Sequence, residues 1–450
     1  MKKDFIKYIK EEFNYSEKEI KDFEVSLGKK LPKSIRINTN KIGIQDFLNL
    51  AKKNKWEVKK TSLGKNTFYI NNNDKEIALG SSVEHITGYF YIQELAATSA
   101  PFYLSNDKIS KEKYLILDMS ASPGGKTTQL SEYYPNSIIV ANELNKKRMQ
   151  GFFSNLDRMS SLNTVCTNYD GRFFKNIPEL FDKIILDAPC SGEGTAYKTS
   201  EALKYWNIKN IKKIAKLQYG LFESAIKTLK PGGEMTYSTC TLNSIENEGV
   251  IEKILEKYSK YIKVLAIGES KEYKYKRNWP HIDETGGFFV AKIKKISSIP
   301  NGDNIKSLKQ NIEKLSGTEY KMISSFFETN FGFSLSPYYL FKYKNNIHLG
   351  NKNLNELWDK LFIFKIGINI GEIKNNSFIP NFNSGTFERF NKNAIEINKE
   401  EIDLLFKGTS IEKKLKDGFY QLQNNKLMCG IGKIQNNKLK SLIKTNLIRK

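Results

Sequence analysis

The chain has 450 residues, of which 39% are hydrophobic, and a formal net charge of +23 at pH 7. This length exceeds one ordinary domain, and we expect two or three domains, each with its own core. No stretch approaches the roughly 20 unbroken apolar residues of a membrane span, and the opening MKKDFIKYIKEEF lacks the apolar centre of a secretion signal, so a cytoplasmic protein is expected. Four cysteines without disulfide-scaffold density or the paired spacing of a zinc site predict no metal.

The positive charge favours a polyanionic partner, because lysine and arginine neutralise phosphates and release counterions. Nearly all the basic residues are lysine, which could also reflect a codon-biased genome; we favour nucleic acid, because such a bias alone would be offset by more acidic residues. The C-terminal end has no Asp or Glu among Lys426, Lys433, Lys438, Lys440, Lys444, Arg449 and Lys450. This end is either a folded RNA-binding module or a solvated tail.

Residues 1–110 have a mixed pattern. Helical periodicity covers residues 2–13, 17–27 and 44–54, the segment LPKSIRINTN is extended, and short strands follow. We expect an accessory RNA-binding domain in this part of the chain.

From Tyr114 onward, strands alternate with glycine turns and helices. The expected strands are YLILDM, SIIVANE, TVCTNYD, FDKIILDAPC and GEMTYSTC, and the intervening helices include KTTQLSEYY, KKRMQGFFSNLDRM and residues 209–229. This alternation predicts an α/β domain over residues 111–297, with a parallel sheet covered by helices and a last strand in FFVAKIKK. SSIPNGDN follows as a linker, and residues 305–450 form a third region with strands such as PYYLFKY.

Two cysteines stand in similar settings, ILDAPCSGEGT around Cys190 and YSTCTLNSIENE around Cys240. Each follows an apolar run that predicts a buried parallel strand, at residues 184–186 and 235–237. Since the carboxyl ends of such strands meet at the edge of the sheet where ligands collect, both thiols should lie there beside Asp187. One carboxylate beside two thiols indicates covalent attack.

The string LDMSASPGGKTT, residues 117–128, follows a predicted strand and opens a predicted helix. A phosphate-binding P-loop would place glycine where this chain has Ser120, although the GKT that follows matches. The string also lacks the three spaced glycines of a dinucleotide-binding turn. In the third interpretation, Gly124 and Gly125 allow close approach of the amino-acid part of S-adenosylmethionine.

Three acidic residues favour a nucleoside ligand. Glu143 ends the second predicted strand, where it can accept hydrogen bonds from ribose hydroxyls. Asp170 ends the third and could receive an adenine amino group, and Asp187 ends the fourth, next to Cys190. One such carboxylate alone is more often solvated, but three at successive strand ends favour the nucleoside interpretation.

These strings resemble the Fmu/Sun family of RNA cytosine-5 methyltransferases. The resemblance rests on PGGKT at 123–127, ANE at 141–143, DAPCSGEG at 187–194 and STCTLN at 238–243, and on the outlying SIRINT at 34–39, GYFYIQE at 88–94 and RNWPHIDETGGFFVAK at 277–292. The C-terminal part is similar to the bacterial RsmF subgroup, which acts on small-subunit ribosomal RNA and carries a module resembling a PUA domain, here near residues 375–450. The chain departs from the family at Ser120 and Ser122, where small Ala or Cys residues are usual, and at Tyr197, where arginine is usual; the latter places one RNA contact in doubt.

The resemblance implies a Rossmann-like methyltransferase domain and S-adenosylmethionine as cofactor. It implies that Cys240 attacks carbon 6 of cytosine, that Cys190 assists product release, and that Asp187, supported by Lys126, binds the cytosine edge. The cofactor would be held by Ser120, Ala121, Ser122, Pro123, Gly124, Gly125, Lys126, Glu143, Arg148, Asp170 and Asp187. The substrate would be 16S ribosomal RNA, or alternatively transfer RNA, and the protein a monomer.

Three other classes of protein compete with this interpretation. A P-loop ATPase acting on nucleic acid is favoured by GGKTT but opposed by Ser120. A noncatalytic RNA-binding protein with a relic fold is opposed by the two intact cysteines, and a DNA cytosine methyltransferase would use Cys190 as the nucleophile. Within the RNA interpretation, Arg36 and the aromatic residues 89–91 are candidates for holding the RNA backbone, and residues from about 305 onward are expected to supply affinity rather than chemistry.

Overall fold

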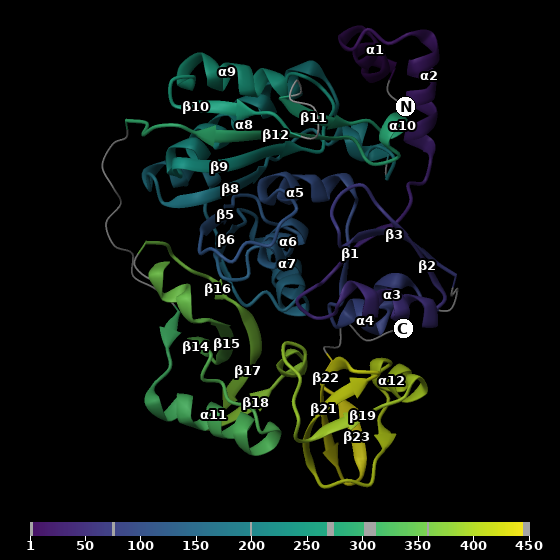
Figure 1. Cartoon of the computed structure of the whole chain (residues 1–450), viewed down its shortest axis with the longest axis vertical. Coiled ribbons are helices and arrows are strands. Elements are labelled where there is room, and N and C mark those ends of the chain that lie inside the picture. Colours follow the sequence, from purple (N-terminus) through teal and green to yellow (C-terminus); the bar gives the residue numbers. More distant parts are fainter. Residues whose placement is uncertain are drawn as a thin grey trace.

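The computed structural model describes residues 3–73, 77–198, 200–267, 274–300, 312–357 and 360–443. At its centre is a nine-stranded sheet in the order β10-β12-β9-β8-β5-β6-β7-β16, with β11 paired to β12 off this path (Figure 1). The strands are β5 (Leu115–Asp118), β6 (Ile138–Asn142), β7 (Thr164–Thr167), β8 (Phe181–Asp187), β9 (Leu229–Thr239), β10 (Ile262–Leu265), β11 (Tyr275–Asn278), β12 (Phe288–Lys295) and β16 (Lys365–Ile366). The five from β5 to β9 are parallel, and the others join antiparallel, which confirms the predicted α/β architecture.

Helices cover both faces of this sheet. Leu117 and Leu186 point to the face covered by α8 (Ile208–Thr228) and α9 (Glu248–Tyr258). Their chain neighbours Ile116 and Ile185 point to the other face, which packs against α5 (Ser99–Ser105) and α6 (Gly125–Tyr133), with α7 (Lys146–Arg158) beside them. Because successive strand residues alternate between faces, strands buried on both sides read as continuous apolar runs, and this is the signal that the sequence carried.

The chain order of the strands defines where a ligand can bind. From β5 the chain moves outward to β6 and β7, and it then returns to place β8 and β9 on the other side of β5. The point between β5 and β8 is therefore a topological switch point, and ligands bind at such points outside the carboxyl ends of the strands.

The N-terminal part contains a four-stranded sheet in the order β2-β3-β1-β4, separate from the central sheet. Its elements are α1 (Lys3–Glu12), α2 (Glu17–Gly28), β1 (Ser34–Ile37), α3 (Ile44–Lys53), β2 (Trp56–Lys60), β3 (Thr67–Asn72), α4 (Val83–Ile86) and β4 (Phe90–Ile92). The three predicted helices are confirmed by α1, α2 and α3. Figure 1 shows α1 and α2 away from the small sheet. The two helices pack on Leu203, Trp206 and Ile211, in a core that also contains Leu242 from the loop after Cys240.

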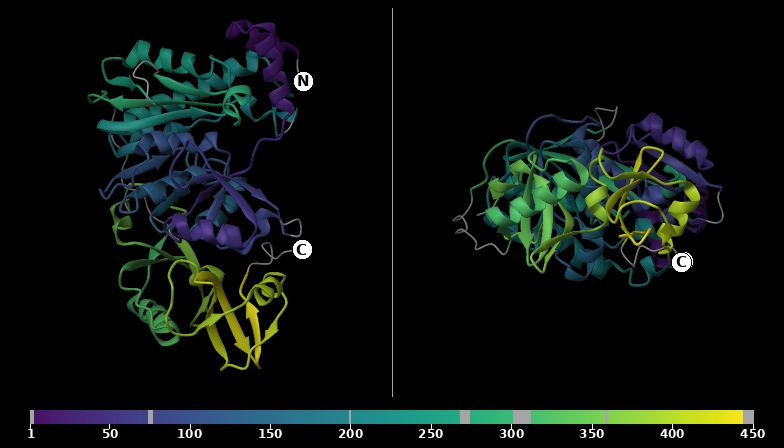
Figure 2. Two further views of the ribbon diagram at one scale, coloured as in Figure 1. Left: turned by 45° about the vertical axis from the view of Figure 1, so that its right-hand side comes forward. Right: turned by 90° about the horizontal axis from the view of Figure 1, so that it is seen from below.

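The C-terminal part forms the lower tier of the molecule in Figure 2, with two five-stranded sheets. The first has the order β13-β14-β15-β17-β18 and contains β13 (Glu313–Lys314), α11 (Gly317–Phe331), β14 (Tyr338–Tyr343), β15 (Asn346–Asn351), β17 (Ile368–Lys374) and β18 (Ser377–Pro380). The second has the order β19-β21-β22-β23-β20 and contains β19 (Ala394–Glu396), α12 (Lys399–Phe406), β20 (Ile411–Glu412), β21 (Gly418–Asn424), β22 (Leu427–Gln435) and β23 (Lys438–Ser441). A further short helix, α10 (Pro280–Asp283), precedes β12.

Residues from about 305 onward, which are expected to supply affinity and positioning rather than chemistry, also contribute to the central sheet. Strand β16 pairs with β7 and so completes the central sheet. Ile312, Phe341 and Leu361 belong to the same buried core as the catalytic strands. Lys365 donates to the carboxylate of Asp157 on α7 at 2.6 Å, and both side chains are buried. The third region is therefore part of the fold that supports the predicted site.

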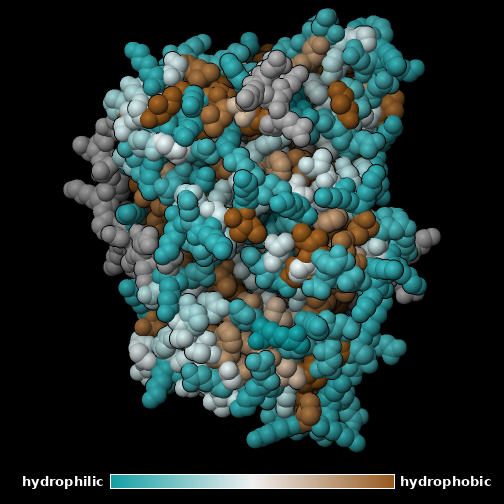
Figure 3. Space-filling view, viewed as in Figure 1, coloured by the Kyte–Doolittle hydropathy of each residue, from teal (hydrophilic) through white to brown (hydrophobic). Residues whose placement is uncertain are grey.

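Two remaining expectations concern the surface. In the described part of the chain, no helix is both long and apolar enough to cross a membrane. Hydrophilic side chains cover most of the face in Figure 3, and hydrophobic ones form small scattered groups. Of the basic C-terminal residues, Lys433 and Lys440 lie opposite each other on β22 and β23, whereas Lys444, Arg449, Lys450 and residues 301–304 of the predicted linker lie outside the described residues.

Candidate active site

The two cysteines meet at the carboxyl edge of the central sheet. Strands β8 and β9 are parallel neighbours, and Asp187 at the end of β8 is in register with Ser238 near the end of β9. The loops that follow bring the Sγ atoms of Cys190 and Cys240 to 3.3 Å, and both thiols are free. The sequence prediction that both thiols lie at one edge beside Asp187 is confirmed by this geometry.

Two buried glutamates hold the cysteine loops together. Glu193, on the Cys190 loop, accepts hydrogen bonds from the backbone N–H groups of Leu242 and Asn243, both at 3.0 Å. Glu246, beyond the Cys240 loop, accepts a hydrogen bond from the backbone N–H of Ser191 at 3.0 Å. A carboxylate from each cysteine segment thus accepts hydrogen bonds from the backbone of the other segment. Because buried acceptors are costly to leave unpaired, these bonds fix the separation of the two thiols.

Lys126 and Asp187 form an ion pair beside the thiols. The Nζ atom of Lys126 lies 2.7 Å from Oδ2 of Asp187, and Ser238 donates to Oδ1 at 2.8 Å. Burial disfavours the Lys126 charge, but the attraction of Asp187 outweighs it and the pKa of Lys126 is raised. The carboxylate is therefore oriented by two donors, one of which is charged.

The two thiols have opposite pKa shifts. The hydrogen bond between them lowers the pKa of Cys240, and Lys126 contributes in the same direction against burial and the charge of Asp187. The same hydrogen bond, together with burial, raises the pKa of Cys190 well above its ordinary value. These directions correspond to Cys190 as donor and Cys240 as thiolate acceptor. Cys240 is thus the more nucleophilic of the two at neutral pH.

A cavity of about 400 Å³ opens beside these groups. Its lining includes Asp187 and Cys240, and among the residues expected to hold a cofactor it includes Ser120, Ala121, Ser122, Pro123, Gly125, Lys126 and Arg148. Gly124 does not line the cavity but shapes the loop: its φ of +107° favours glycine, and a Cβ there would lie 3.1 Å from the Phe152 ring. Cys190 is not among the residues that line the cavity, but its Sγ atom contacts that of Cys240, which does line it.

Neither Glu143 nor Asp170 lines the cavity: Glu143 directly follows β6, whereas β7 ends at Thr167, so Asp170 does not end this strand as predicted but lies three residues beyond it. Glu143 is buried, accepts from the backbone N–H of Asn145 at 2.7 Å and lies 3.6 Å from Nη1 of Arg148, which in turn donates to the carbonyl of Ser122 at 2.7 Å. Asp170 is paired with Arg172 at 2.6 Å, and its pKa is lowered by this bond. Of the two carboxylates, Glu143 is therefore the one connected to the glycine loop.

The sequence analysis assigned no role to several residues that line the cavity. Glu94 accepts a hydrogen bond from the backbone N–H of Gly286 at 2.8 Å, and Phe288 lies under the ammonium group of Lys126 at 5.5 Å. Tyr197 lines the cavity as well. Gly194 and Gly287 cross so closely that a Cβ on Gly287 would lie 2.6 Å from the Gly194 Cα. Glu94, Gly286, Gly287 and Phe288 could have been found only through the family strings GYFYIQE and RNWPHIDETGGFFVAK, Gly194 ends the string DAPCSGEG, and Tyr197 stands out only as a departure from the family.

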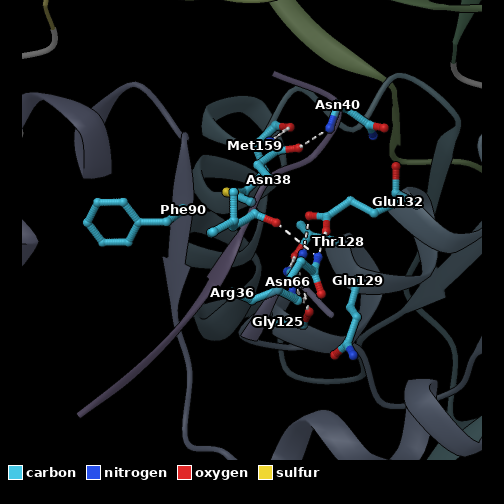
Figure 4. Close-up of polar contacts among 12 residues, drawn as sticks. Arg36, Asn38, Asn40, Asn66, Phe90, Gly125, Thr128, Gln129, Glu132 and Met159 are labelled. Carbon is cyan, nitrogen blue, oxygen red and sulfur yellow. Dashed lines mark hydrogen bonds and ion pairs between the residues drawn. The ribbon is translucent and has the colours of Figure 1, made fainter. Parts of the chain in front are cut away.

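The suggestion that Arg36 and residues 89–91 hold the RNA backbone is wrong. Arg36 is completely buried, pairs with the carboxylate of Glu132, and donates to the Gly125 carbonyl at 3.2 Å and to the Thr128 hydroxyl at 2.6 Å (Figure 4). Tyr89, Phe90 and Tyr91 are buried too. Arg36 thus fastens the N-terminal sheet to the start of α6, Tyr89 accepts a hydrogen bond from the backbone N–H of Met428, and Tyr91 lines the cavity.

A doubly wound sheet, a glycine loop opening a helix at its switch point, and a carboxylate directly after the next strand are typical of α/β folds that bind a nucleoside, and S-adenosylmethionine-dependent methyltransferases are one such class. The family model for the 16S rRNA methyltransferase RsmB/F matches residues 108–294, and that for the N-terminal domain of 16S rRNA methyltransferase RsmF matches residues 1–95. The chain is 32% identical to ribosomal RNA small subunit methyltransferase F of Shewanella piezotolerans, over 96% of this chain and 94% of that protein. It therefore belongs to the ribosomal RNA small subunit methyltransferase F family.

Further comparisons agree with this family. The corresponding protein of Aeromonas salmonicida is 35% identical over 78% of this chain and 76% of its own length. Among solved structures, a methyltransferase homolog protein from Pyrococcus horikoshii matches with a TM-score of 0.54 and 28% identity, over 66% of this chain and 100% of that chain. NSun6 from the same organism, with SFG, has a TM-score of 0.56 at 22% identity, over 66% of this chain and 99% of that chain, and shows the shared fold.

Proposed function

We propose that this protein transfers a methyl group from S-adenosylmethionine to carbon 5 of a cytosine in the RNA of the small ribosomal subunit, through a covalent adduct with Cys240. The observation that carries the proposal is the contact of Cys190 and Cys240 at 3.3 Å beside the ion pair of Lys126 and Asp187. The family membership supports the RNA substrate. We further propose that the protein acts as a monomer in the cytoplasm.

The cofactor fits the residues present. S-adenosylmethionine, when bound, would supply a methyl group on an electrophilic sulfonium. Residues 120–123, 125 and 126 form one wall of the cavity, and Glu143 offers a buried carboxylate for ribose hydroxyls. Arg148, between this carboxylate and the loop carbonyl of Ser122, would position both. Asp170 would take part only if its pair with Arg172 opened, and we assign it the weaker role.

Carbon 5 of cytosine is too weak a nucleophile to accept a methyl group unaided. In the proposed reaction, the Cys240 thiolate forms a bond to carbon 6, and electron density builds at carbon 5, which then takes the methyl group. Loss of the carbon 5 proton restores the double bond and expels the thiolate. Asp187, held by Lys126 and Ser238, would hydrogen-bond the cytosine edge and stabilise the adduct.

Cys190 is placed to assist the last step. Its thiol hydrogen-bonds Cys240 in the free enzyme and has a raised pKa, so it is the protonated partner. When Cys240 is expelled from carbon 6, a hydrogen-bond donor at this distance stabilises the leaving thiolate. The cytosine must leave its stack to reach the cavity, so single-stranded or opened RNA is the expected form of substrate.

The different roles proposed for Cys240 and Cys190 can be tested by replacing each cysteine in turn. Cys240→Ala should abolish both methyl transfer and any covalent RNA complex. Cys190→Ala should permit attack and methylation but slow release, so that a protein–RNA adduct survives denaturing electrophoresis. The buried Cys166→Ala is the matched control, because that thiol lies on β7 and away from the cavity, and it should behave as wild type.

Two outcomes would contradict the proposal. An adduct trapped by Cys240→Ala and absent from Cys190→Ala would reverse the two roles and favour the arrangement of a DNA cytosine methyltransferase. Turnover in both variants without any adduct would exclude covalent catalysis through these cysteines. Comparing free small-subunit RNA, assembled subunits and transfer RNA as methyl acceptors identifies the substrate.

A further inference from the structure

A second groove lies on the N-terminal sheet, outside the catalytic cavity. Its volume is about 710 Å³, and its lining includes Lys30, Lys33, Lys59 and Tyr69. The opposite face of this sheet packs against α3 through buried residues such as Phe68 and Ile70. Because side chains alternate along a strand, Lys59 on β2 and Tyr69 on β3, which are direct partners, stand on the open face.

The groove is bordered by basic and aromatic side chains. The segment between α2 and β1 forms one wall, and the Lys33 carbonyl accepts from the Ile70 backbone N–H at 2.9 Å, which fixes this wall against β3. Lys30, Lys33 and Lys59 are exposed, and Tyr69 is half-buried. One acidic residue, Glu57, also lines the groove, where it accepts hydrogen bonds from the side chains of Asn71 and Asn73 at 3.3 and 2.8 Å.

A row of side chains joins the groove to the catalytic cavity. Lys59 is the partner of Tyr69, and Tyr69 is the partner of Ser34 on β1. Gln93, which follows β4, donates its backbone N–H to the Ser34 carbonyl at 3.1 Å and lines the catalytic cavity. Four adjacent strands at about 4.8 Å spacing make this row roughly 14 Å long. Burial and then the carboxylates of Glu284, Glu94 and Asp283 raise the pKa of Tyr69, and Glu94 lines the catalytic cavity.

We propose that this groove binds the single-stranded RNA that flanks the target cytosine, with Tyr69 stacking on a base and Lys30, Lys33 and Lys59 contacting phosphates. Adjacent strands of one sheet link the groove to the cavity that would receive the cytosine, and the three lysines of the groove complement the charge of the RNA backbone. A partly exposed aromatic ring between lysines is the combination that binds single strands without strong sequence preference. The inference rests on the proposed function, because that function supplies the RNA.

The test uses the full-length protein and a short single-stranded RNA containing the target cytosine. Tyr69→Leu should weaken RNA binding by about 5- to 150-fold, the loss expected for one base–aromatic stack, whereas Tyr69→Phe should bind as wild type. A triple Lys30→Gln, Lys33→Gln and Lys59→Gln variant should lower the salt slope of binding by roughly 2, since each phosphate contact on a single strand contributes about 0.7. Affinity for S-adenosylmethionine should not change in any of them.

The matched control replaces three exposed lysines on the opposite side of the central sheet, Lys253→Gln, Lys260→Gln and Lys263→Gln, on or next to α9 and β10 (Figure 1). This variant should keep the wild-type affinity and slope. Equal losses in the control and groove variants would show a diffuse charge effect and overturn the proposal. Groove variants that bind free RNA as wild type but fail on assembled subunits would show that the groove receives a protein instead.

Failure of the groove and failure of the proposed function give different results. If the wild-type protein bound RNA through the groove but methylated none, the proposed reaction would be wrong and the proposal that the groove binds RNA would be supported. If it methylated RNA and the groove variants did so with unchanged KM, the reaction would stand and the groove would be wrong.

Discussion

Arg36 offers the sharpest test of how the N-terminal sheet supports the glycine loop. It is fully buried and bonds Glu132 and Thr128 of α6 and the carbonyl of Gly125 at the start of that helix. Arg36→Met would leave the Glu132 charge buried without its cationic partner. Breaking a buried pair in this way costs about 3–5 kcal/mol. At roughly 1 °C per kcal/mol for a chain of 450 residues, we expect a melting temperature lower by about 3–5 °C.

The stability lost in Arg36→Met should depend on pH, because the pKa of Glu132 changes in this variant. Burial raises the pKa of Glu132, and Arg36 opposes that rise, so the variant should raise it further. A carboxyl group with a raised pKa in the folded state favours folding while it is protonated and loses that contribution as pH rises through the folded pKa. The variant should therefore be less destabilised at about pH 5 than at about pH 8.

A double variant, Arg36→Met with Glu132→Gln, is the control. It leaves no unpaired charge, and the amide oxygen introduced by Glu132→Gln can keep the hydrogen bond that Asn66 donates at 3.2 Å. We expect it to recover part of the lost stability, which calorimetric scans at both pH values would measure. Titration calorimetry should show weaker S-adenosylmethionine binding by the single variant. Unchanged stability combined with weaker RNA binding would refute the reasoning and return Arg36 to the RNA interface.

Three further predictions concern the thiols, the cofactor and the C-terminal region. Because the hydrogen bond from Cys190 is the main cause of the lowered Cys240 pKa, the rate of adduct formation in Cys190→Ala should reach its half-maximum at higher pH than in wild type, and an unshifted profile would contradict this cause. Glu143→Gln should lose roughly 1–3 kcal/mol of S-adenosylmethionine affinity by calorimetry, more than Asp170→Asn, whose side chain is 39% exposed and already paired. Deleting residues 305–450 should destabilise the catalytic sheet in thermal unfolding, whereas Lys433→Gln with Lys440→Gln should keep the fold and lower the RNA salt slope by about 1.4.

The catalytic edge of the sheet could be predicted because its signals are local. The apolar runs at 184–186 and 235–237 required strands buried on both faces, and parallel strands end at a common edge. The meeting of Cys190 and Cys240 followed from that rule alone. The same reasoning placed Asp187 beside them.

The buried charges could not be predicted, because burial is decided by contacts far apart in the sequence. From the sequence alone, Arg36 is expected to be an exposed cation, because its partner Glu132 lies 96 residues further along the chain. Glu193 and Glu246 stand in polar strings that are typical of solvated loops, and only the crossing of the two loops encloses them. Strand β16, two residues long, has no periodicity to detect and is recognised only by its pairing with β7.

Lysine illustrates why composition alone overstates the RNA-binding surface. Lys126, Lys292, Lys295 and Lys365 contribute to the net charge of +23, yet each is paired with a carboxylate and at most 14% of its side chain is exposed. These lysines stabilise the sheet and the site and cannot neutralise a phosphate while so paired. The salt slope counts only the lysines that release counterions on binding. It therefore separates the groove and the β22–β23 surface from the structural lysines, which net charge cannot do.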